Sequence, residues 1–231
     1  ITSPSCSIKI LYFTDDFSIE KQKGIFYQQT RIHHFSAKDS LLFTIESAQQ
    51  DFFQPNILIL STENKEEMNC EELFLKASDF GLGIIYQSQR VQNIPALEKI
   101  NVWIRPQGPN WDLNTARTEG NLDLILLMAI QLAKQKQLQI CLITTLDSTE
   151  EMERAQEFLE GLSDLGRLPK TTKAIAFLGS LWSSLHQAPS AKIHIFGLPE
   201  IQPFTFIEQT EEYLDGNLLF IRSSGKENLL A

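Results

Sequence analysis

The sequence predicts an α/β fold made of two related βαβ-type halves with mainly parallel sheets. Short, nearly continuous apolar segments recur along the chain, and segments with helix-start and helix-end residues lie between them. The second half also repeats the apolar and helix-boundary pattern of the first. Continuous apolar strands are expected where helices cover both faces of a parallel sheet.

Eight segments have the composition of buried strands. They are SIKILYF (7–13), NILIL (56–60), GIIYQ (83–87), NVWIR (101–105), QICLITTL (139–146), KAIAFLG (173–179), KIHIFG (192–197) and NLLFIR (217–222). Alternation of such strands with helices favours parallel pairing through crossover connections.

The clearest helix begins at Ser148, which we expect to form a capping box with Glu151. Gly166 and then Pro169 mark its end. Its apolar residues are spaced to form one face, which consists of Met152, Ala155, Phe158, Leu159, Leu162 and Leu165. This pattern predicts a surface helix packed on a sheet.

The segment 121–137 is apolar nearly all round from Leu124 to Ile130, and it turns basic at Lys134 and Lys136. One interpretation is a helix buried between the sheet and neighbouring helices. The other is a helix with one face directed at a second subunit. The sequence does not separate the two.

A weak internal repeat relates the halves. At an offset of 136 residues, PNILILSTENKEEMNCEELF (55–74) aligns with AKIHIFGLPEIQPFTFIEQT (191–210). The alignment matches the capping pair Asn69 and Glu72 to Thr205 and Glu208, and one deleted residue later it matches Gly81 to Gly216. We therefore predict an N-terminal α/β half over residues 1–100 and a C-terminal α/β half over 101–231, with the boundary in the Pro-containing stretch 89–99.

Composition excludes several classes of protein. The 231 residues are 42% hydrophobic, enough for one large core or two modest ones. The formal charge of -9 is expected to repel phosphate backbones and anionic lipid headgroups. Three widely spaced cysteines favour a reducing cytosol. No apolar stretch reaches the roughly 18 to 20 residues that span a bilayer. The chain opens at Ile1 without Met, which suggests a fragment of a longer protein.

The chain lacks the GxSxG, GxxxxGK[ST] and GxGxxG patterns that would expose a nucleophile or cradle a phosphate. The segment SSGKEN (223–228) follows the last strand, and we expect a solvated tail there. The acidic side chains of the helix after Ser148 form one solvated face, whereas acid–base catalysis needs carboxylates facing each other across a cleft. We expect structural roles for all four histidines, His33, His34, His186 and His194. We therefore assign no catalytic, cofactor-binding or metal-binding residue.

The loop RPQGPNWDL (105–113) combines two prolines, a glycine and Trp111 at the end of a strand. The tryptophan is either a platform for a ligand or partner, or a plug that folds back onto the core. Trp103 and Trp182 are expected in the core.

The second half also resembles a known family. NVWIRP (101–106), NLDLILLMAIQLA (121–133), ICLITTL (140–146), SAKIHIFGLPE (190–200) and EEYLDGNLLFIRSSGKENLLA (211–231) follow one another. This succession is similar to the cytosolic C-terminal domain of cation-chloride cotransporters. There a Val-Trp strand precedes a very apolar helix, a late strand ends in a small-x-Leu-Pro sequence, and an arginine-bearing strand closes the chain. Long insertions of animal members are missing, so a prokaryotic type of member is the closer comparison.

The resemblance implies two halves related to universal stress proteins, on the cytoplasmic side of the cell membrane, below a transmembrane domain that moves chloride with sodium or potassium. It further implies homodimerisation and a part in regulation or trafficking. The expected partners are a second copy and the protein's own transmembrane domain, and neither nucleic acid nor nucleotide is expected.

Two alternatives remain, a nucleotide-binding module like the universal stress proteins and a free-standing enzyme. Universal stress proteins that bind ATP use a glycine-rich run after a late strand. The matching segment FGLPEIQPF (196–204) carries Pro199 and Pro203 where glycines are wanted. Proline removes amide donors, so we expect no ATP cradle. The upstream reading frame and a thermal shift with ATP would separate these hypotheses.

Overall fold

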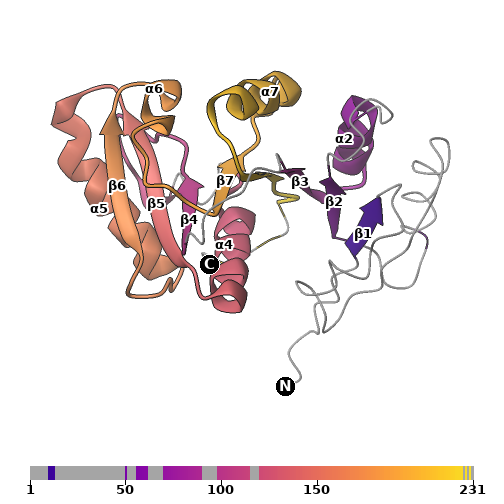
Figure 1. The fold of residues 1–231 in the computed structure, drawn as a ribbon, viewed down its shortest axis with the longest axis horizontal. Helices are drawn as coiled ribbons and strands as arrows, with labels where there is room; N and C mark the ends of the chain where they lie inside the picture. Colours follow the sequence, from indigo (N-terminus) through magenta and orange to yellow (C-terminus); the bar gives the residue numbers. More distant parts are fainter. Residues whose placement is uncertain are drawn as a thin grey trace. The chain divides into compact units, whose positions relative to one another are not determined.

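The structure is a computed structural model (Figure 1), and it describes residues 10–13, 50, 56–61, 70–89, 98–114, 120–225, 227 and 229. The chain divides into two compact units, Ile1–Gln87 and Ser88–Ala231. The boundary that the sequence predicts, within 89–99, falls largely on residues 90–97, which lie outside the described residues. His33 and His34 also lie outside them.

Unit 1 contains a parallel three-stranded arrangement with one described helix. Its elements are β1 (Ile10–Phe13), β2 (Ile57–Ser61), α2 (Cys70–Asp79) and β3 (Gly83–Gln89). β2 pairs in parallel with β1 and with β3. Phe74 of α2 packs edge-on against Tyr86 of β3, with ring centroids 6.2 Å apart. Gly81 follows α2 at φ +61°, a conformation that favours glycine.

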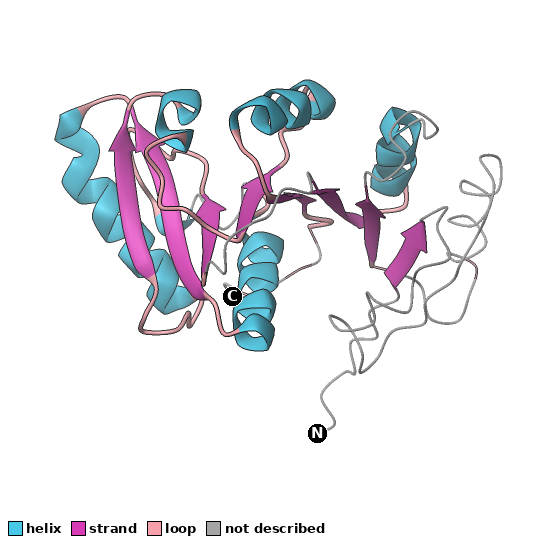
Figure 2. Ribbon diagram, in the orientation of Figure 1, coloured by secondary structure: helices cyan, strands magenta, loops and turns pink. Residues whose placement is uncertain are grey.

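Unit 2 contains five parallel strands in the order β8-β7-β4-β5-β6. The strands are β4 (Lys99–Trp103), β5 (Gln139–Leu146), β6 (Lys173–Leu178), β7 (Ile193–Gly197) and β8 (Asn217–Arg222). The helices are α4 (Leu122–Lys136), η3 (Thr149–Glu151), α5 (Met152–Leu165), α6 (Leu181–Leu185) and α7 (Pro203–Tyr213). Figure 2 shows the alternation of strands and helices. The predicted α/β class, with mainly parallel pairing in each half, is confirmed.

Helices cover both faces of the unit 2 sheet. Consecutive strand residues point to opposite faces. The ring of Phe196 packs edge-on against Phe206 of α7, with centroids 6.1 Å apart. The adjacent Gly197 lies against α4, where an added Cβ would stand 3.2 Å from Cδ1 of Ile125. Thus α4 and α7 cover opposite faces, and α6 joins α7 through the contact of Trp182 with Phe206.

The α4 helix is buried over most of its circumference. Its buried residues are Leu122, Leu124, Ile125, Leu126, Met128, Ala129, Ile130, Leu132 and Ala133. The helix contacts β4, β5, β7 and β8. Of the two interpretations of this segment, the structure supports burial within one copy of the chain. Little apolar surface of α4 is therefore left for a second subunit.

The start and apolar face of α5 differ from their prediction. Ser148 Oγ accepts a hydrogen bond from the amide of Glu150 at 3.2 Å, and a 3-10 turn precedes the α-helix. The Glu151 carboxylate binds Trp111 instead of closing a capping box. Met152 and Leu165, predicted on the apolar face, are exposed by 38% and 36% because they lie at the two ends of the helix.

The repeat aligns the strands but misplaces the start of the second helix. α7 begins at Pro203, preceded by Gln202 at φ +51°, so Thr205 lies inside the helix and does not cap it. Gly216 does not end the helix as predicted, because α7 ends at Tyr213 with the extended Leu214 as its C-cap; Gly216, at φ +127°, directly precedes β8. Both units contain a parallel βαβ crossover, β2-α2-β3 and β7-α7-β8.

A buried polar row crosses the middle of the sheet. Asn101 of β4 is in register with Cys141 of β5 and with His194 of β7. Asn101 Nδ2 donates to the carbonyl of Pro189 at 2.6 Å. Cys141 is a fully buried free thiol, and burial raises its pKa. Trp103 Nε1 donates to His194 Nδ1 at 3.3 Å, so the neutral ring carries its proton on Nε2.

His194 should make unit 2 sensitive to acid. Burial lowers its pKa from 6.5 to about 4. Between those values the unfolded chain binds a proton that the folded chain excludes, so stability is complete above about pH 6.5 and falls as the pH drops toward 4. We expect this one group to cost about 2 kcal/mol of unfolding free energy between pH 7 and pH 5.

Denaturant unfolding at the two pH values checks this prediction. In His194→Gln, the loss of unfolding free energy between pH 7 and pH 5 should shrink by that amount. The matched variant His186→Gln, at an exposed histidine, should keep the full loss. An unchanged pH dependence in His194→Gln would contradict the prediction.

Candidate functional site

The strand order of unit 2 reverses between β4 and β7. From β4 the chain continues to β5 and β6 on one side, and β7 and β8 lie on the other. Segments leaving the carboxyl ends of β4 and β7 therefore diverge to opposite faces. In open α/β sheets, ligands bind outside the strand ends at such a crossover point. This edge is the place where a site is expected.

Asn121, at the start of α4, joins the elements that meet at this crossover point. Its Nδ2 donates to the carbonyl of Leu198, after β7, at 2.9 Å. Its Oδ1 accepts the amide of Ser223, after β8, at 2.9 Å. Gly197 allows the close approach, because a Cβ there would stand 3.3 Å from the Asn121 amide nitrogen. One side-chain amide thus connects α4, the loop after β7 and the end of β8.

Arg222, at the end of β8, makes a second hydrogen bond to the loop after β7. Its Nη2 donates to the carbonyl of Pro199 at 2.9 Å. Burial lowers the pKa of the guanidinium, and the neighbouring Glu200 carboxylate opposes that effect. The loop after β7 is therefore held from two directions, by α4 and by β8.

The segment after Arg222 binds a carboxylate of the chain itself. Ser223 Oγ donates to Glu227 Oε2 at 2.5 Å, and Ser224 donates its hydroxyl to Oε1 at 2.9 Å and its amide to Oε2 at 3.0 Å. Burial alone would raise the pKa of Glu227, but these hydrogen bonds lower it. The Leu229 amide then donates to Asp123 of α4 at 2.7 Å. The expectation of a solvated tail is wrong for the described residues here, because Ser223 and Ser224 bind Glu227, and Leu229 binds the start of α4.

The arrangement leaves little chemistry for phosphate binding. A phosphate cradle needs free backbone amides directed at one point. Pro199 and Pro203 have no amide hydrogen, and the Leu198 amide already donates to the Ile221 carbonyl at 2.8 Å. The Ser223–Ser224 donors hold Glu227. The groups that converge at the crossover point are therefore engaged with each other.

The proline-rich loop after β4 folds back on α5. Trp111 is buried, its Nε1 donates to Glu151 Oε2 at 2.7 Å, and its ring meets Phe158 edge-on with centroids 5.7 Å apart. Arg154 Nη1 donates to the carbonyl of Pro109 at 2.9 Å. Of the two interpretations of this loop, the structure supports the plug.

The remaining residues singled out in the sequence have structural surroundings. His186 caps the end of α6 and packs on Tyr213, and His194 lies inside the sheet. Trp103 is in the core as predicted, whereas Trp182 is only half-buried, between Phe206 and Tyr213. Within the described part of the chain, no group of three or more His, Cys, Asp and Glu residues has a geometry suited to a metal ion.

Sequence reasoning missed Asn121, Asp123 and Glu227. Asn121 precedes an apolar helix, which is a recognised cap position, but its side chain makes no cap bond and reaches other elements instead. The serine pair before Glu227 is a signal for local carboxylate binding that pattern searches for phosphate motifs do not test.

We predict that Asn121→Ala lowers the unfolding free energy by about 2 kcal/mol, because it leaves the half-buried Leu198 carbonyl and Ser223 amide without their partner. Asn121→Asp keeps the acceptor for the Ser223 amide and loses only the donor to Leu198. Its loss of unfolding free energy should therefore differ from that of the alanine variant. Asn114→Ala is the matched control, since the Asn114 side chain is exposed and donates to the neighbouring Asp112. Chemical denaturation measures all three, and equal stability of Asn121→Ala and Asn114→Ala would refute the assignment.

Among the described residues, none of the helices is both long enough and apolar enough to cross a bilayer. No match is found among curated protein sequences. The fold is similar to the crystal structure of the cytoplasmic domain of a prokaryotic cation chloride cotransporter, with a TM-score of 0.79 and 22% identity over 97% of this chain and 98% of that one. A functionally unknown protein of Pseudomonas aeruginosa PAO1 is similar with a TM-score of 0.53 and 11% identity, over 94% of this chain and 82% of that one.

Two family models cover nearly the whole chain. Residues 1–92 match the first part of the C-terminal domain of prokaryotic cation-chloride cotransporters, and residues 96–230 match the second part. The second match includes the segments on which the sequence resemblance rests, from NVWIRP to the final strand. The chain therefore belongs to the family of C-terminal domains of prokaryotic cation-chloride cotransporters.

Proposed function

We propose that this chain is the cytoplasmic regulatory and dimerisation domain of a cation-chloride cotransporter. It would lie on the cytoplasmic side of the cell membrane, attached to its own transmembrane domain, which moves chloride with sodium or potassium. The observation that carries the proposal is the match of both halves to the two parts of one transporter domain. The fold shared with a cytoplasmic domain of that kind supports the location.

The crossover point favours a regulatory role over catalysis. A catalytic site needs polar groups that are available to a substrate. Here Asn121, Arg222 and the Ser223–Ser224 pair bind groups of the chain itself, which holds the carboxyl edge of the sheet in one arrangement. Because Asn121 joins α4 to the end of β8, a displacement of one would pull on the other. The expectation that the chain does not bind ATP stays a prediction, for calorimetry with ATP to test.

The regulatory role predicts that removing this chain changes transport without abolishing it. The full cotransporter and a version ending before Ile1 would be reconstituted in vesicles at equal density, and chloride uptake driven by a sodium or potassium gradient would be measured. We expect uptake to persist in the truncated protein with an altered rate or dependence on internal chloride. Identical uptake by the two proteins would contradict regulation, and a reading frame without apolar spans upstream would contradict the transporter assignment.

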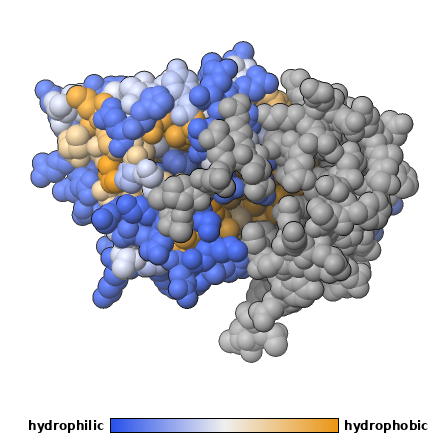
Figure 3. Space-filling view, viewed as in Figure 1, coloured by the Kyte–Doolittle hydropathy of each residue, from blue (hydrophilic) through white to orange (hydrophobic). Residues whose placement is uncertain are grey.

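A homodimer needs a surface other than α4, and the outer edge of β6 is the apolar surface that we propose for it. β6 is the last strand in the order of unit 2, and all six of its residues are at least partly exposed, in contrast to the buried β5. Apolar residues follow Lys173 without a break to Leu178, which is 49% exposed. Hydrophobic colour lies over α5 and β6 in Figure 3. An unprotected apolar edge strand favours pairing with a second strand, and a two-fold axis would pair β6 with its copy.

Sedimentation equilibrium over a wide concentration range tests this dimer, with a monomer mass of 26.3 kDa. We expect Leu178→Lys to raise the dimer dissociation constant about tenfold or more, because a charge would enter the apolar interface. Ile201→Lys is the matched control, since Ile201 is 81% exposed on the loop after β7. A chain that stays monomeric at several hundred micromolar would refute the dimer, and a dimer unaffected by Leu178→Lys would refute the β6 surface.

A further inference from the structure

The amino-terminal ends of β4, β5 and β6 form one continuous edge. The Gln139 amide, at the start of β5, donates to the Glu98 carbonyl before β4 at 2.7 Å. The Gln139 side chain donates to the Thr171 carbonyl before β6 at 2.7 Å. Because α4 and α5 return antiparallel to the strands, both helices also end at this edge.

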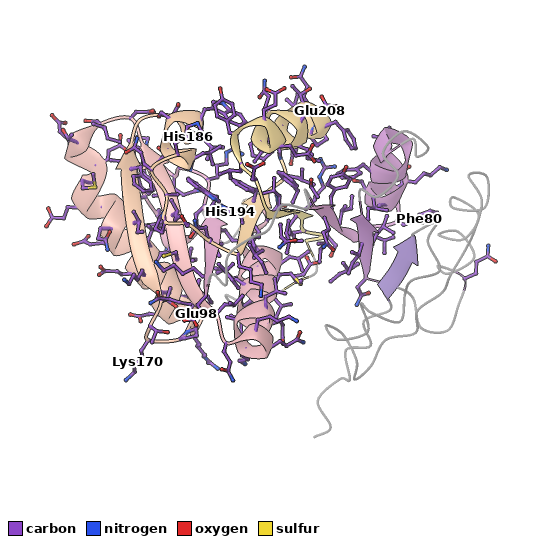
Figure 4. The ribbon with its side chains drawn as sticks, viewed as in Figure 1. Phe80, Glu98, Lys170, His186, His194 and Glu208 are labelled. Atoms are coloured by element: carbon purple, nitrogen blue, oxygen red, sulfur yellow. The ribbon has the colours of Figure 1, made fainter. Side chains whose placement is uncertain are left out.

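Basic side chains gather on that edge. We call this surface the basic edge. Its residues are Lys99, Lys134, Lys136, Arg167, Lys170 and Lys173. All of these side chains are exposed except that of Lys99, which is half-buried. The acidic residues of the same helix ends and strand starts are Glu98 and Asp164. Figure 4 labels Lys170 and Glu98 at this edge, with Glu208 of α7 far from it, and Figure 3 shows the same edge as hydrophilic.

The charge around β4, β5 and β6 is therefore unevenly distributed; elsewhere on the amino edge of unit 2, Lys192 precedes β7, and Glu212 and Asp215 precede β8. At the opposite, carboxyl edge, the described acidic residues outnumber the basic ones, which are Arg105, Arg154 and Arg222. The acidic residues there are Asp112, Asp123, Asp147, Glu150, Glu151, Glu153, Glu200 and Glu227. In a chain with a formal charge of -9, a locally positive edge runs against the overall charge. It requires an explanation of its own.

Helix ends explain only part of the basic edge. Lys134 and Lys136 lie in the last turn of α4 and Arg167 follows the end of α5, where cations interact favourably with the helix dipole. Lys99, Lys170 and Lys173 are different, because they lie just before or at the start of strands, beyond the last turn of a helix, where the helix dipole has little effect. A function of this surface that requires positive charge accounts for both groups, the basic residues at helix ends and those at strand starts.

We propose that the basic edge of unit 2 docks onto anionic lipid headgroups of the membrane. As a domain of a membrane cotransporter, this chain would be held within reach of a bilayer. Cytoplasmic loops of membrane proteins carry an excess of Lys and Arg and therefore repel a basic surface. Anionic lipids in the cytoplasmic leaflet attract it, and each basic residue near the surface strengthens binding severalfold.

Screening allows a negatively charged domain to bind an anionic surface through one edge. At physiological ionic strength the Debye length is about 8 Å. A strand of the length of β5 spans roughly 25 Å, so acidic residues at the carboxyl edge lie several Debye lengths from a membrane that contacts the basic edge. At low ionic strength the repulsion from those acidic residues extends further. Binding should therefore be strongest near physiological salt and weaken both above and below it.

Vesicle cosedimentation of this chain tests the proposal. Phosphatidylcholine vesicles with and without phosphatidylglycerol would be compared over a range of salt concentrations around 0.15 M. We expect binding only with phosphatidylglycerol. The variant Lys134→Gln, Lys136→Gln, Lys170→Gln should bind on the order of tenfold or more weakly. These three side chains are exposed, so their replacement should leave the fold unchanged, and circular dichroism checks this.

The matched control makes the same change in net charge away from the basic edge. It combines Arg105→Gln, Thr205→Glu and Gln209→Glu, all at exposed positions, and it should bind as the original chain does. Equal loss in the control would show an effect of net charge and overturn the proposal. Equal binding to neutral vesicles, undiminished binding by the lysine variant, or no binding at any salt concentration would also overturn it.

A salt-sensitive self-association that the lysine variant removes, without vesicle binding, would assign the basic edge to a second copy of the chain and overturn lipid docking. The inference rests on the proposed location at the membrane. Its failure would leave the transport experiment untouched, because none of the three lysines enters that test.

Discussion

The arrangement of unit 2 depends on the burial of a parallel sheet on both faces. Each strand places alternate side chains under different helices, as Phe196 and Gly197 of β7 show. Both sets of side chains must then be apolar or have internal partners, as Asn101 and His194 do. Parallel pairing also collects all strand starts on one edge and all strand ends on the other. The sheet thereby separates the basic edge from the crossover point at the carboxyl edge.

The sequence was a good guide wherever hydrophobic burial decides the structure. Each of the eight predicted strands has a counterpart in the described residues, because strands of a parallel sheet that helices cover are apolar along most of their length. Position along a helix was harder to predict. α7 begins at Pro203, where proline fits the first turn, although Thr205 resembles a better cap. Local preferences at helix ends are worth about 1 kcal/mol, so tertiary contacts override them.

The candidate site was the least predictable part. Asn121 bonds to residues that lie 77 and 102 positions further along the chain, and no local pattern encodes such a pairing. Similarly, Glu151 was predicted to cap its own helix but binds Trp111, 40 positions away. What the sequence could indicate was the chemistry that this edge lacks, since prolines stand where amide donors would be needed. Family resemblance, rather than residue chemistry, carried the functional assignment, and the family models support it.

The buried thiol of Cys141 has a practical consequence. It lies in an interior strand of unit 2, fully enclosed, with burial holding it in the unreactive protonated form. A thiol reagent can reach its sulfur only when β5 separates from the elements around it. In a chain whose other two cysteines are replaced, the alkylation rate of Cys141 would therefore report how often this unit opens. The alkylation rate could be compared between the isolated chain and the full cotransporter. A lower rate in the cotransporter would show that attachment to the membrane portion makes the domain more rigid, and a higher rate would show that it makes the domain looser.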